Sequence, residues 1–323
     1  MAQRRRRRRR RFNPRFLVLV GFMALLLILM IWGIASCTGS SDPQDTTGST
    51  DSLQDTKPQY GWMEENGKRY YLKPDGSRAT GWLEVDGKRY LLTGEGYTQS
   101  GWIDGLYFRP DGSMAQGAVE IDGKTVYFTS QGKEILLVNP WNPVPEGYEP
   151  DLVDLSLDIS VEGSKVDRSC YDALVAMIAA CNKECPRLCV LSSYRTNEYQ
   201  TNAFERKVQS YTSKGYSRED AEREAATVVA RPGTSEHQLG LAVDIIDTRE
   251  WSLEESQKNL PAQKWLMEHS WEYGFILRYP EGKIDKTGII FEPWHYRYVG
   301  PEVAKEIHES GLTLEEYLER LTS

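Results

Sequence analysis

The sequence predicts an α+β domain that follows a β-hairpin repeat module and one transmembrane helix. Three features support this fold class: an uncharged apolar run near the N-terminus, a twenty-residue aromatic repeat, and a C-terminal half in which helical and strand patterns alternate irregularly. Helices and short strands in irregular order are typical of α+β domains. With 323 residues, the chain is long enough for one sizeable core and a smaller module.

The N-terminal residues predict a membrane anchor. Residues 1–15 carry nine arginines and no acidic residue, and residues 16–35 contain no charged residue. As an α-helix, the uncharged run is ~30 Å long, which is about the thickness of the hydrocarbon core of a bilayer. Arginines directly before such a span indicate that residues 1–15 are cytoplasmic and that the remainder of the chain is extracytoplasmic.

Two alternatives place the body of the chain on the same side of the membrane. A cleaved secretory signal has an apolar region of only ~7–15 residues, which is shorter than this run. The segment Ile34-Ala35-Ser36-Cys37 resembles a lipoprotein processing box, in which Cys37 is lipidated and becomes the new N-terminus. We favour an uncleaved single-pass anchor because of the length of the span.

The formal net charge of −8 is the sum of a basic N-terminal segment and an acidic remainder of the chain. The nine N-terminal arginines belong to a total of 39 Lys and Arg, so the remaining residues have 30 such side chains against 47 Asp and Glu. Nucleic-acid binding requires a cationic surface, and this composition argues against it. A nucleotide site is not expected either, because no glycine-rich phosphate loop follows a predicted strand.

Four cysteines, Cys170, Cys181, Cys185 and Cys189, lie within twenty residues of one another. In an exported protein, such a cluster indicates disulfides more often than a metal site. Pro186 interrupts the segment and no histidine lies nearby, so we expect disulfides. Four cysteines allow three pairings, and the sequence does not choose among them.

A linker at residues 36–59 and a repeat module at residues 60–138 are expected next. The linker is rich in Ser, Thr, Gly and Asp and has too few apolar residues to fold. The module has Gly-Trp pairs at twenty-residue intervals, with a degenerate fourth unit: Gly61-Trp62, Gly81-Trp82, Gly101-Trp102 and Gly117-Ala118. Asn-Gly and Asp-Gly dipeptides within the units favour two-residue hairpin turns with positive φ. Because one hairpin is not stable alone, successive units must stack.

These repeats resemble the cell-wall-binding repeats of Gram-positive surface proteins, including choline- and glucan-binding modules. The resemblance implies that aromatic side chains of neighbouring repeats form shallow cages for choline or sugar, so that residues 60–138 bind a cell-wall polymer. The alternative is that Trp62, Trp82 and Trp102 are simply the core between repeats and that the module is a spacer. The sequence leaves both interpretations open.

A proline-rich joint at residues 139–145 begins the second domain, which we expect to span residues 139–323. Hydrophobic periodicity, turn residues and apolar runs identify its elements. The expected helices are at residues 170–181, 217–231 and 261–274, and the expected strands are at residues 187–191, 241–246 and 291–299.

Two of the four histidines stand in segments that suit metal binding. His237 and Asp244 are seven residues apart, on either side of Gly240. On a continuous helix they would lie about 10.5 Å apart along the axis, and in one strand they would point to opposite faces. A turn near Gly240 can bring them together. The other two, His269 and His308, occur in amphipathic helical segments without a carboxylate motif, and we expect them at the surface.

Asp244 lies in an apolar run, where an isolated ionised carboxylate is very costly. Metal coordination explains its presence, and a buried, hydrogen-bonded aspartate is the alternative. His295 supplies a further ligand, and Glu292 stands three residues before it. Two histidines and one carboxylate with an open position make a catalytic zinc site. A glutamate beside such a site can take a proton from a water molecule whose pKa the zinc lowers towards ~7.

Arg195 and Gln200 follow the strand predicted at residues 187–191. An arginine and an amide near a zinc site suit the recognition of a carboxylate or a polarised carbonyl group. The alternative for Arg195 is a loop arginine in an ion pair.

Three segments together resemble the zinc D,D-carboxypeptidases that include VanY, whose fold is shared with hedgehog signalling domains: SSYRTNEYQ (192–200), RPGTSEHQLGLAVDI (231–245) and EPWHYRYVG (292–300). The resemblance implies a hedgehog/DD-peptidase-like fold over roughly residues 146–320 and a Zn²⁺ cofactor. The zinc ligands that it implies are His237, Asp244 and His295. It further implies that Glu292 is the catalytic base, that Arg195 stabilises the oxyanion, and that the substrate pocket is lined by Arg195, Gln200, Ser235 and Trp294.

By this resemblance, the chain removes the terminal D-Ala from peptidoglycan stem peptides, with a water molecule activated by Glu292 as the nucleophile. L,D-carboxypeptidase activity is an alternative, since one methyl group or stereocentre in a pocket changes specificity by only ~1–3 kcal/mol. A peptidoglycan endopeptidase is another, although a permanent anchor argues against a lysin, which must diffuse. A non-catalytic cell-wall-binding protein would have a closed four-ligand zinc site, whereas only three ligands are found.

Overall fold

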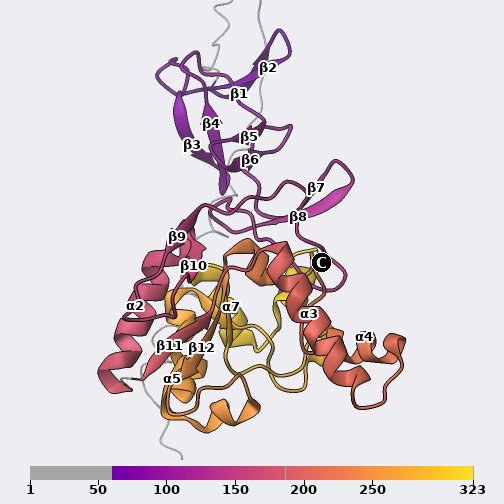
Figure 1. Ribbon diagram of the computed structural model, residues 1–323. Helices are drawn as coiled ribbons and strands as arrows, with labels where there is room; N and C mark the ends of the chain where they lie inside the picture. Colours follow the sequence, from indigo (N-terminus) through magenta and orange to yellow (C-terminus); the bar gives the residue numbers. More distant parts are fainter. Residues whose placement is uncertain (1–59, 186, 323) are drawn as a thin grey trace, which may run out of the picture. The chain divides into compact units, whose positions relative to one another are not determined.

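The computed structural model describes residues 60–185 and 187–322 (Figure 1). The predictions for the first 59 residues, namely the cytoplasmic segment, the anchor, the linker and the lipidation of Cys37, lie outside the described residues. Within the described part of the chain, none of the helices combines the length and the hydropathy that a membrane span requires.

The repeat module consists of antiparallel hairpins. The pairs are β1 (Gly61–Glu65) with β2 (Lys68–Leu72), β3 (Gly81–Val85) with β4 (Lys88–Leu92), β5 (Gly101–Ile103) with β6 (Leu106–Phe108), and β7 (Gly117–Ile121) with β8 (Lys124–Phe128). The first turn has φ values of 53° at Asn66 and 73° at Gly67, and the others are alike. These left-handed conformations confirm the predicted two-residue turns.

Aromatic rings of one hairpin pack on the next hairpin. The contacts, with their centroid separations, are Trp62 with Tyr90 at 4.5 Å, Trp82 with Phe108 at 5.9 Å, and Trp102 with Phe128 at 5.8 Å. The partner rings are buried, whereas Trp82 and Trp102 stay 49% and 50% exposed. The predicted stacking of successive units is therefore confirmed, and it uses only part of each of these two indole surfaces.

A four-stranded antiparallel sheet forms the centre of the C-terminal domain, with the strand order β11-β12-β14-β13. Its strands are β11 (Leu188–Ser192), β12 (Ala242–Asp247), β13 (Phe275–Leu277) and β14 (His295–Tyr298). A separate hairpin-like pair, β9 (Leu152–Asp154) and β10 (Lys165–Asp167), precedes it. Strands β12 and β14, which pair at the centre of the sheet, therefore come from segments that are far apart in the sequence.

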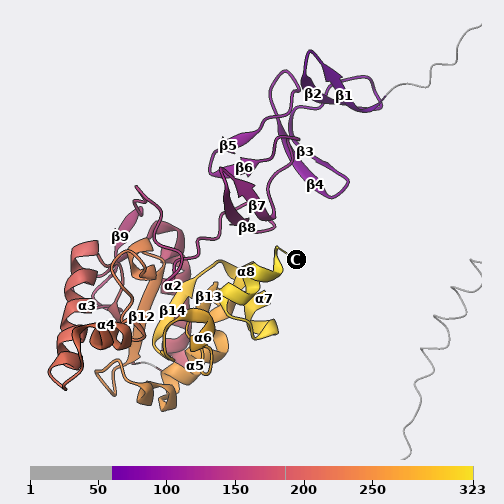
Figure 2. The same cartoon turned by 90° about the vertical axis from the view of Figure 1, so that its right-hand side faces the viewer.

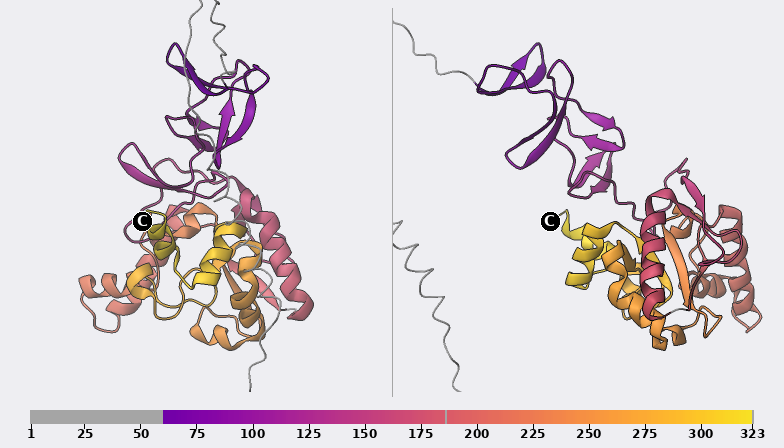
Figure 3. Two further views of the ribbon diagram at one scale, coloured as in Figure 1. Left: turned by 180° about the vertical axis from the view of Figure 1, so that it is seen from behind. Right: turned by 90° about the vertical axis from the view of Figure 1, so that its left-hand side faces the viewer.

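The main core lies between this sheet and α2 (Arg168–Glu184), which runs alongside β11 and β12 (Figures 1 and 3). Leu174 and Met177 of the helix pack with Val190, Val243 and Ile245 of the strands, and all five are buried. A second cluster joins β13 to α7 (Pro301–Ser310) and α8 (Leu314–Arg320), which lie together in Figure 2. The apolar faces expected of the helical and strand segments are therefore buried on each other.

The remaining helices cover the rest of the domain. They are α3 (Asn197–Thr212), α4 (Arg218–Ala226), α5 (Pro261–His269) and α6 (Ile284–Thr287), with 3₁₀ turns η1 (Glu236–Leu239), η2 (Glu255–Asn259) and η3 (Ser270–Tyr273). The helix predicted at residues 261–274 is confirmed as α5 and η3, and it ends at Gly274, where φ is 82°. The polar helix predicted at 217–231 ends early, at Ala226. Of the strand predicted at 291–299, residues 291–294 form no strand, and only β14 is extended.

The predicted disulfides are not formed, because Cys170, Cys181, Cys185 and Cys189 are free thiols. Cys170 and Cys181 are eleven residues apart in α2, so they lie ~16 Å apart along its axis, whereas a disulfide joins Cα atoms ~4.4–6.8 Å apart. Cys185 lies still further along. Cys189 alternates with core residues of β11, so its thiol faces away from α2. No described cysteine can therefore reach Cys170, and each of the three pairings fails.

Candidate metal centre

Asp244 and His295 are directly paired residues of β12 and β14, so their side chains project from the same face of the sheet. That face is opposite to the α2 core, because Val243 and Ile245 alternate with Asp244 and belong to that core. His237 reaches the same place from η1. One donor atom from each of the three buried side chains lies within 4.8 Å of the others. The structure thus brings together the three residues that the sequence predicts as metal ligands.

The turn predicted near Gly240 makes this approach geometrically feasible. Gly240 ends η1 with a φ of 72°, and its N–H donates to the carbonyl oxygen of His237 at 3.2 Å. Its own carbonyl oxygen accepts from the N–H of Asp167 at 2.9 Å. A Cβ atom at position 240 would lie only 2.9 Å from that same nitrogen. The position therefore requires glycine both for its conformation and for the close packing of β10.

The donor set suits zinc. His237 Nε2 lies 3.3 Å from one carboxylate oxygen of Asp244, and His295 Nδ1 lies 3.0 Å from the other. On the far side of its ring, His237 Nδ1 lies 2.7 Å from the carbonyl oxygen of Ser193, which fixes the proton on Nδ1 and leaves Nε2 as the ligand atom. Two imidazole nitrogens and one carboxylate with an open position are the ligands of catalytic zinc sites.

Burial and charge set the protonation of these groups. Burial lowers the pKa of His237 to about 4, with the nearby Arg195 acting in the same direction, so the ring is neutral near pH 7. Burial also acts to lower the pKa of His295, but the hydrogen bond to Asp244 and the nearby carboxylate of Glu236 outweigh it and raise this pKa to about 9. Burial raises the pKa of Asp244, yet His237 and Arg195 overcome it and hold the pKa well below its usual range. Asp244 is therefore the fixed anion of the site.

Arg195 contacts the same carboxylate. Its Nη2 donates to Asp244 Oδ2 at 2.6 Å and its Nε donates to Ser192 Oγ at 2.9 Å. The ion pair considered as an alternative for Arg195 does form, and its partner is a candidate metal ligand. Gln200 is fully buried behind it, 3.5 Å from Arg195 Nη1, and donates to the carbonyl oxygen of Ala230 at 2.7 Å. Gln200 therefore supports Arg195 from within α3.

Glu292 lies at the edge of the three-residue cluster, with a carboxylate oxygen 3.9 Å from His295 Nδ1. It belongs to the irregular segment before β14, and its N–H donates to the carbonyl oxygen of Tyr279 at 3.2 Å. Burial raises the pKa of Glu292 to about 8. A carboxyl group with such a pKa can exchange a proton near neutral pH.

A pocket is lined by the three candidate ligands and by four further residues that the sequence predicts: Arg195, Ser235, Glu292 and Trp294. Gln200 does not line it. Lys207 and Tyr279 do, and sequence reasoning missed them. Lys207 comes from α3, which was not predicted, and no motif marks it. Glu236 was also missed, although it stands beside His237, because nothing in the sequence shows which way its side chain points.

The two remaining histidines lie away from this pocket, as expected. His269 Nδ1 lies 2.8 Å from a carboxylate oxygen of Glu272, and its side chain is 35% exposed. His308 is exposed and stacks on Trp271 at a centroid separation of 4.8 Å. The surface location predicted for both is therefore confirmed.

Residues 163–301 match the VanY family of D-alanyl-D-alanine carboxypeptidases. The chain is 43% identical to a mutant of the VanY D,D-pentapeptidase from a VanB-type vancomycin resistance cassette, solved with Zn(II). This likeness covers 57% of this chain and 97% of that chain, with a TM-score of 0.51. The chain belongs to the VanY family. The α+β class and the VanY-like fold predicted for the C-terminal domain are thereby confirmed.

Two further relatives of the VanY domain are informative. The D-alanyl-D-alanine carboxypeptidase of Enterococcus faecalis is 44% identical over 184 residues, which are 57% of this chain but only 65% of that protein. The L,D-carboxypeptidase LdcB is 36% identical, with a TM-score of 0.51, over 63% of this chain and 94% of that chain. In the N-terminal module, residues 61–77 match a family of cell wall binding repeats.

The close packing at Gly240 gives a prediction about metal binding. In Gly240→Ala, the added Cβ must push η1 away from β10 and displace His237 from Asp244. We expect zinc affinity, measured by competition with a chromogenic chelator, to fall by at least about tenfold, as when supporting groups of metal ligands are lost.

The matched control is Gly163→Ala, which has a similar φ of 79° but nothing within 4 Å of the added Cβ. It carries the same backbone strain without the clash, so its zinc affinity should equal that of the wild type. Equal affinities for both variants would show that the turn does not position His237.

Proposed function

We propose that the chain is a zinc-dependent carboxypeptidase that removes the terminal D-Ala from peptidoglycan stem peptides. One observation carries the proposal: a buried cluster of two histidines and one aspartate has a second acidic side chain, Glu292, 3.9 Å from His295. Such a set offers ligands for the metal and a separate group for proton transfer. Membership of the VanY family supports the choice of reaction and substrate.

His237, Asp244 and His295 would hold the zinc, which lowers the pKa of water and polarises a carbonyl group. Glu292 accepts a proton from the attacking water and passes it to the amine of the departing D-alanine as the C–N bond breaks. Its pKa of about 8 suits a group that must take up and release a proton near neutral pH. Arg195 faces the same pocket, where its guanidinium can donate to the oxyanion.

The pocket favours a carboxypeptidase over an endopeptidase because one of its cations, Lys207, is not held in an ion pair in the described residues, although its charge acts to lower the pKa of Glu292. Arg195 and Lys207 line the pocket, and Arg195 forms an ion pair with Asp244 at 2.6 Å. Lys207 is half-buried and forms no ion pair within the described residues. Its ammonium group lies 5.8 Å from the ring centroid of Tyr211. We assign Lys207 to the C-terminal carboxylate of the peptide, a group that an endopeptidase substrate lacks at the cleavage site.

L,D-carboxypeptidase activity is the second candidate. The likeness to LdcB favours it, because it matches the TM-score of the likeness to the VanY pentapeptidase and covers more of this chain. Both substrates end in D-Ala with a free carboxylate, so Lys207 and Glu292 would serve either reaction. Tetrapeptide and pentapeptide should be assayed side by side.

We further propose that residues 16–35 anchor the chain, that the VanY domain is extracytoplasmic, and that residues 60–138 contact the cell wall. The match of residues 61–77 to a cell wall binding repeat supports the last point. Arg69 lies over the ring of Trp62 at 4.0 Å, and Arg89 lies over Trp82 at 4.5 Å. In the described residues no cation covers Trp102, which is 50% exposed. Of the three repeat tryptophans, Trp102 therefore offers the freest ring surface for a sugar or a quaternary ammonium group.

The proposal is tested with full-length protein and a muropeptide that ends in D-Ala-D-Ala, with mass spectrometry to detect loss of one alanine. Glu292→Gln keeps the shape of the side chain but cannot transfer the proton, so turnover should fall by ~10²–10⁴-fold. Zinc content should not change. Glu281→Gln, at a side chain that is 74% exposed, is the control and should keep full activity. A chelator should abolish the activity of the wild-type protein. Turnover at the wild-type rate in Glu292→Gln would contradict the proposal.

The role of Lys207 is tested by comparing a peptide with a free C-terminal carboxylate and the same peptide with a C-terminal amide. A hydrogen bond to a charged group contributes ~1.5–3 kcal/mol, so wild-type kcat/KM should favour the carboxylate by roughly 10–100-fold. In Lys207→Gln the two peptides should become nearly equal. Lys214→Gln is the matched control, since Lys214 also lies over Tyr211, at 5.4 Å, but does not line the pocket. An unchanged preference in Lys207→Gln would assign carboxylate recognition to another residue.

A further inference from the structure

The two histidines of the metal centre present different ring nitrogens to it. His237 offers Nε2, because its Nδ1 faces the carbonyl oxygen of Ser193 at 2.7 Å. His295 offers Nδ1, which lies 3.0 Å from Asp244 and 3.9 Å from Glu292. To bind a metal through Nδ1, a neutral His295 must carry its proton on Nε2. What fixes that proton decides whether the site can form.

The side chain that faces His295 Nε2 is Glu236. Its Oε2 lies 3.7 Å from that nitrogen, and both atoms are buried without a hydrogen-bond partner in the described residues. The other oxygen, Oε1, accepts from Arg278 Nε at 2.8 Å and from Arg297 Nη1 at 2.8 Å. The two guanidinium groups therefore fix one carboxylate oxygen and leave the second aimed at the imidazole ring.

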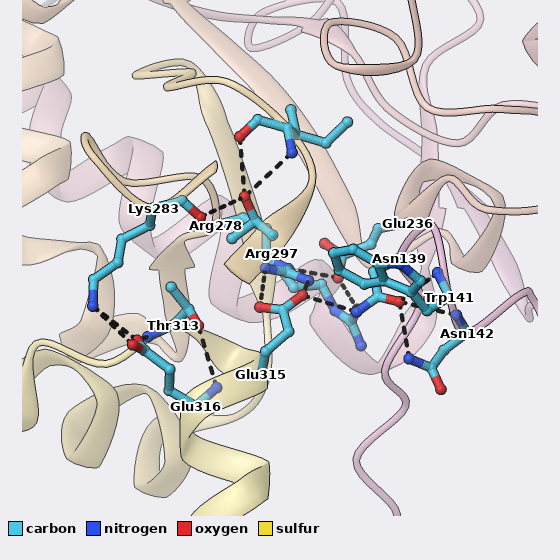
Figure 4. A network of polar contacts seen from close by, with 12 residues as sticks. Asn139, Trp141, Asn142, Glu236, Arg278, Lys283, Arg297, Thr313, Glu315 and Glu316 are labelled. Carbon is cyan, nitrogen blue, oxygen red and sulfur yellow. Dashed lines mark hydrogen bonds and ion pairs between the residues drawn. The ribbon is translucent and has the colours of Figure 1, made fainter. Parts of the chain in front are cut away.

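A buried network holds the two arginines in turn (Figure 4). Arg278 donates to both oxygens of Glu315, at 2.9 and 2.5 Å, and Glu315 also accepts from Asn139 Nδ2 at 3.0 Å. Arg297 donates to the carbonyl oxygen of Leu136 at 2.8 Å. Two acidic and two basic side chains thus balance in charge within this network, as buried ions require. Leu136 lies at the end of the repeat module, and Asn139 is the first residue of the joint that follows it.

We propose that Glu236 is a positioning residue of the metal centre, which accepts the Nε2–H of His295 and so directs the Nδ1 lone pair towards the metal position beside Asp244. The role rests on the proposed metal site but not on the proposed substrate. Metal-binding histidines commonly donate their second N–H to a carboxylate or a carbonyl group, and the carbonyl oxygen of Ser193 accepts such a hydrogen bond from His237. Glu236 completes the pair with the opposite tautomer.

The test compares two buried carboxylates that contact the same arginine. In Glu236→Gln, the guanidinium groups of Arg278 and Arg297 donate to the amide oxygen, so the amide NH₂ faces His295 Nε2. That nitrogen must then act as an acceptor, which moves the proton to Nδ1 and blocks the metal. Glu315→Gln removes the same charge from Arg278 but does not face His295. We expect Glu236→Gln to weaken zinc binding about 10–100-fold, as for other supporting groups of metal ligands, and Glu315→Gln to leave it nearly unchanged.

A spectroscopic measurement separates positioning from general destabilisation. The chain has only four histidines, so ¹⁵N-histidine labelling of the full-length protein gives few ring signals. Zinc-loaded wild type should show His295 protonated on Nε2, with that proton in slow exchange, and His237 protonated on Nδ1.

Either of two results would overturn the proposal: His295 protonated on Nδ1 in the zinc-loaded wild type, or wild-type zinc affinity in Glu236→Gln. The first result requires no variant, so it applies even if Glu236→Gln does not fold. Zinc-loaded protein that shows the expected tautomers but leaves every muropeptide intact would contradict the proposed function instead.

Discussion

The pairing of Asp244 with His295 between two antiparallel strands is the constraint on which the rest of the site depends. It fixes a carboxylate in a sheet where it is only 2% exposed, and an isolated anion in such a place is very costly. The fold supplies partners from separate segments: His237 at 3.3 Å from η1 and Arg195 at 2.6 Å from the loop after β11. The anion thus draws these segments together, and the pocket forms where they meet.

The central sheet separates two environments by the alternation of its side chains. One face of β12 and β14 contributes Val243, Ile245 and Tyr296 to the apolar core with α2, and the other contributes Asp244 and His295 to the pocket. The polar face is backed by the ion-pair network of Arg278 and Arg297. Buried ion pairs are weak arguments for stability, but they do fix geometry. Here they hold Glu236 against a candidate metal ligand.

The sequence identified the site wherever local pattern and chemistry agree. The seven-residue spacing of His237 and Asp244 across Gly240 required a turn, and an aspartate in an apolar strand required partners; the structure contains both. The hairpin turns were equally predictable, because Asn66-Gly67 and the Asp-Gly dipeptides of the later repeats favour the positive φ that such turns need.

Other features depended on contacts between distant segments and were not predictable. Lys207 lies on a helix that was not predicted, and the direction of Glu236 is set by arginines 42 and 61 residues away along the chain. The disulfide prediction was wrong because cysteine spacing does not show that Cys170 and Cys189 belong to opposite sides of β11. Cysteine content can suggest that a protein is exported, but only the fold determines whether two thiols are close enough to form a disulfide.

The central claim is that His237, Asp244 and His295 form one metal site with the ring nitrogens assigned above. The most direct test is a crystal structure of the zinc-loaded protein with anomalous data collected at the zinc absorption edge. We predict one strong peak at ~2.0–2.2 Å from His237 Nε2, an oxygen of Asp244 and His295 Nδ1, with Glu292 outside the set of ligands. A peak bound through His295 Nε2, a direct bond to Glu292, or zinc bound only elsewhere would contradict the account.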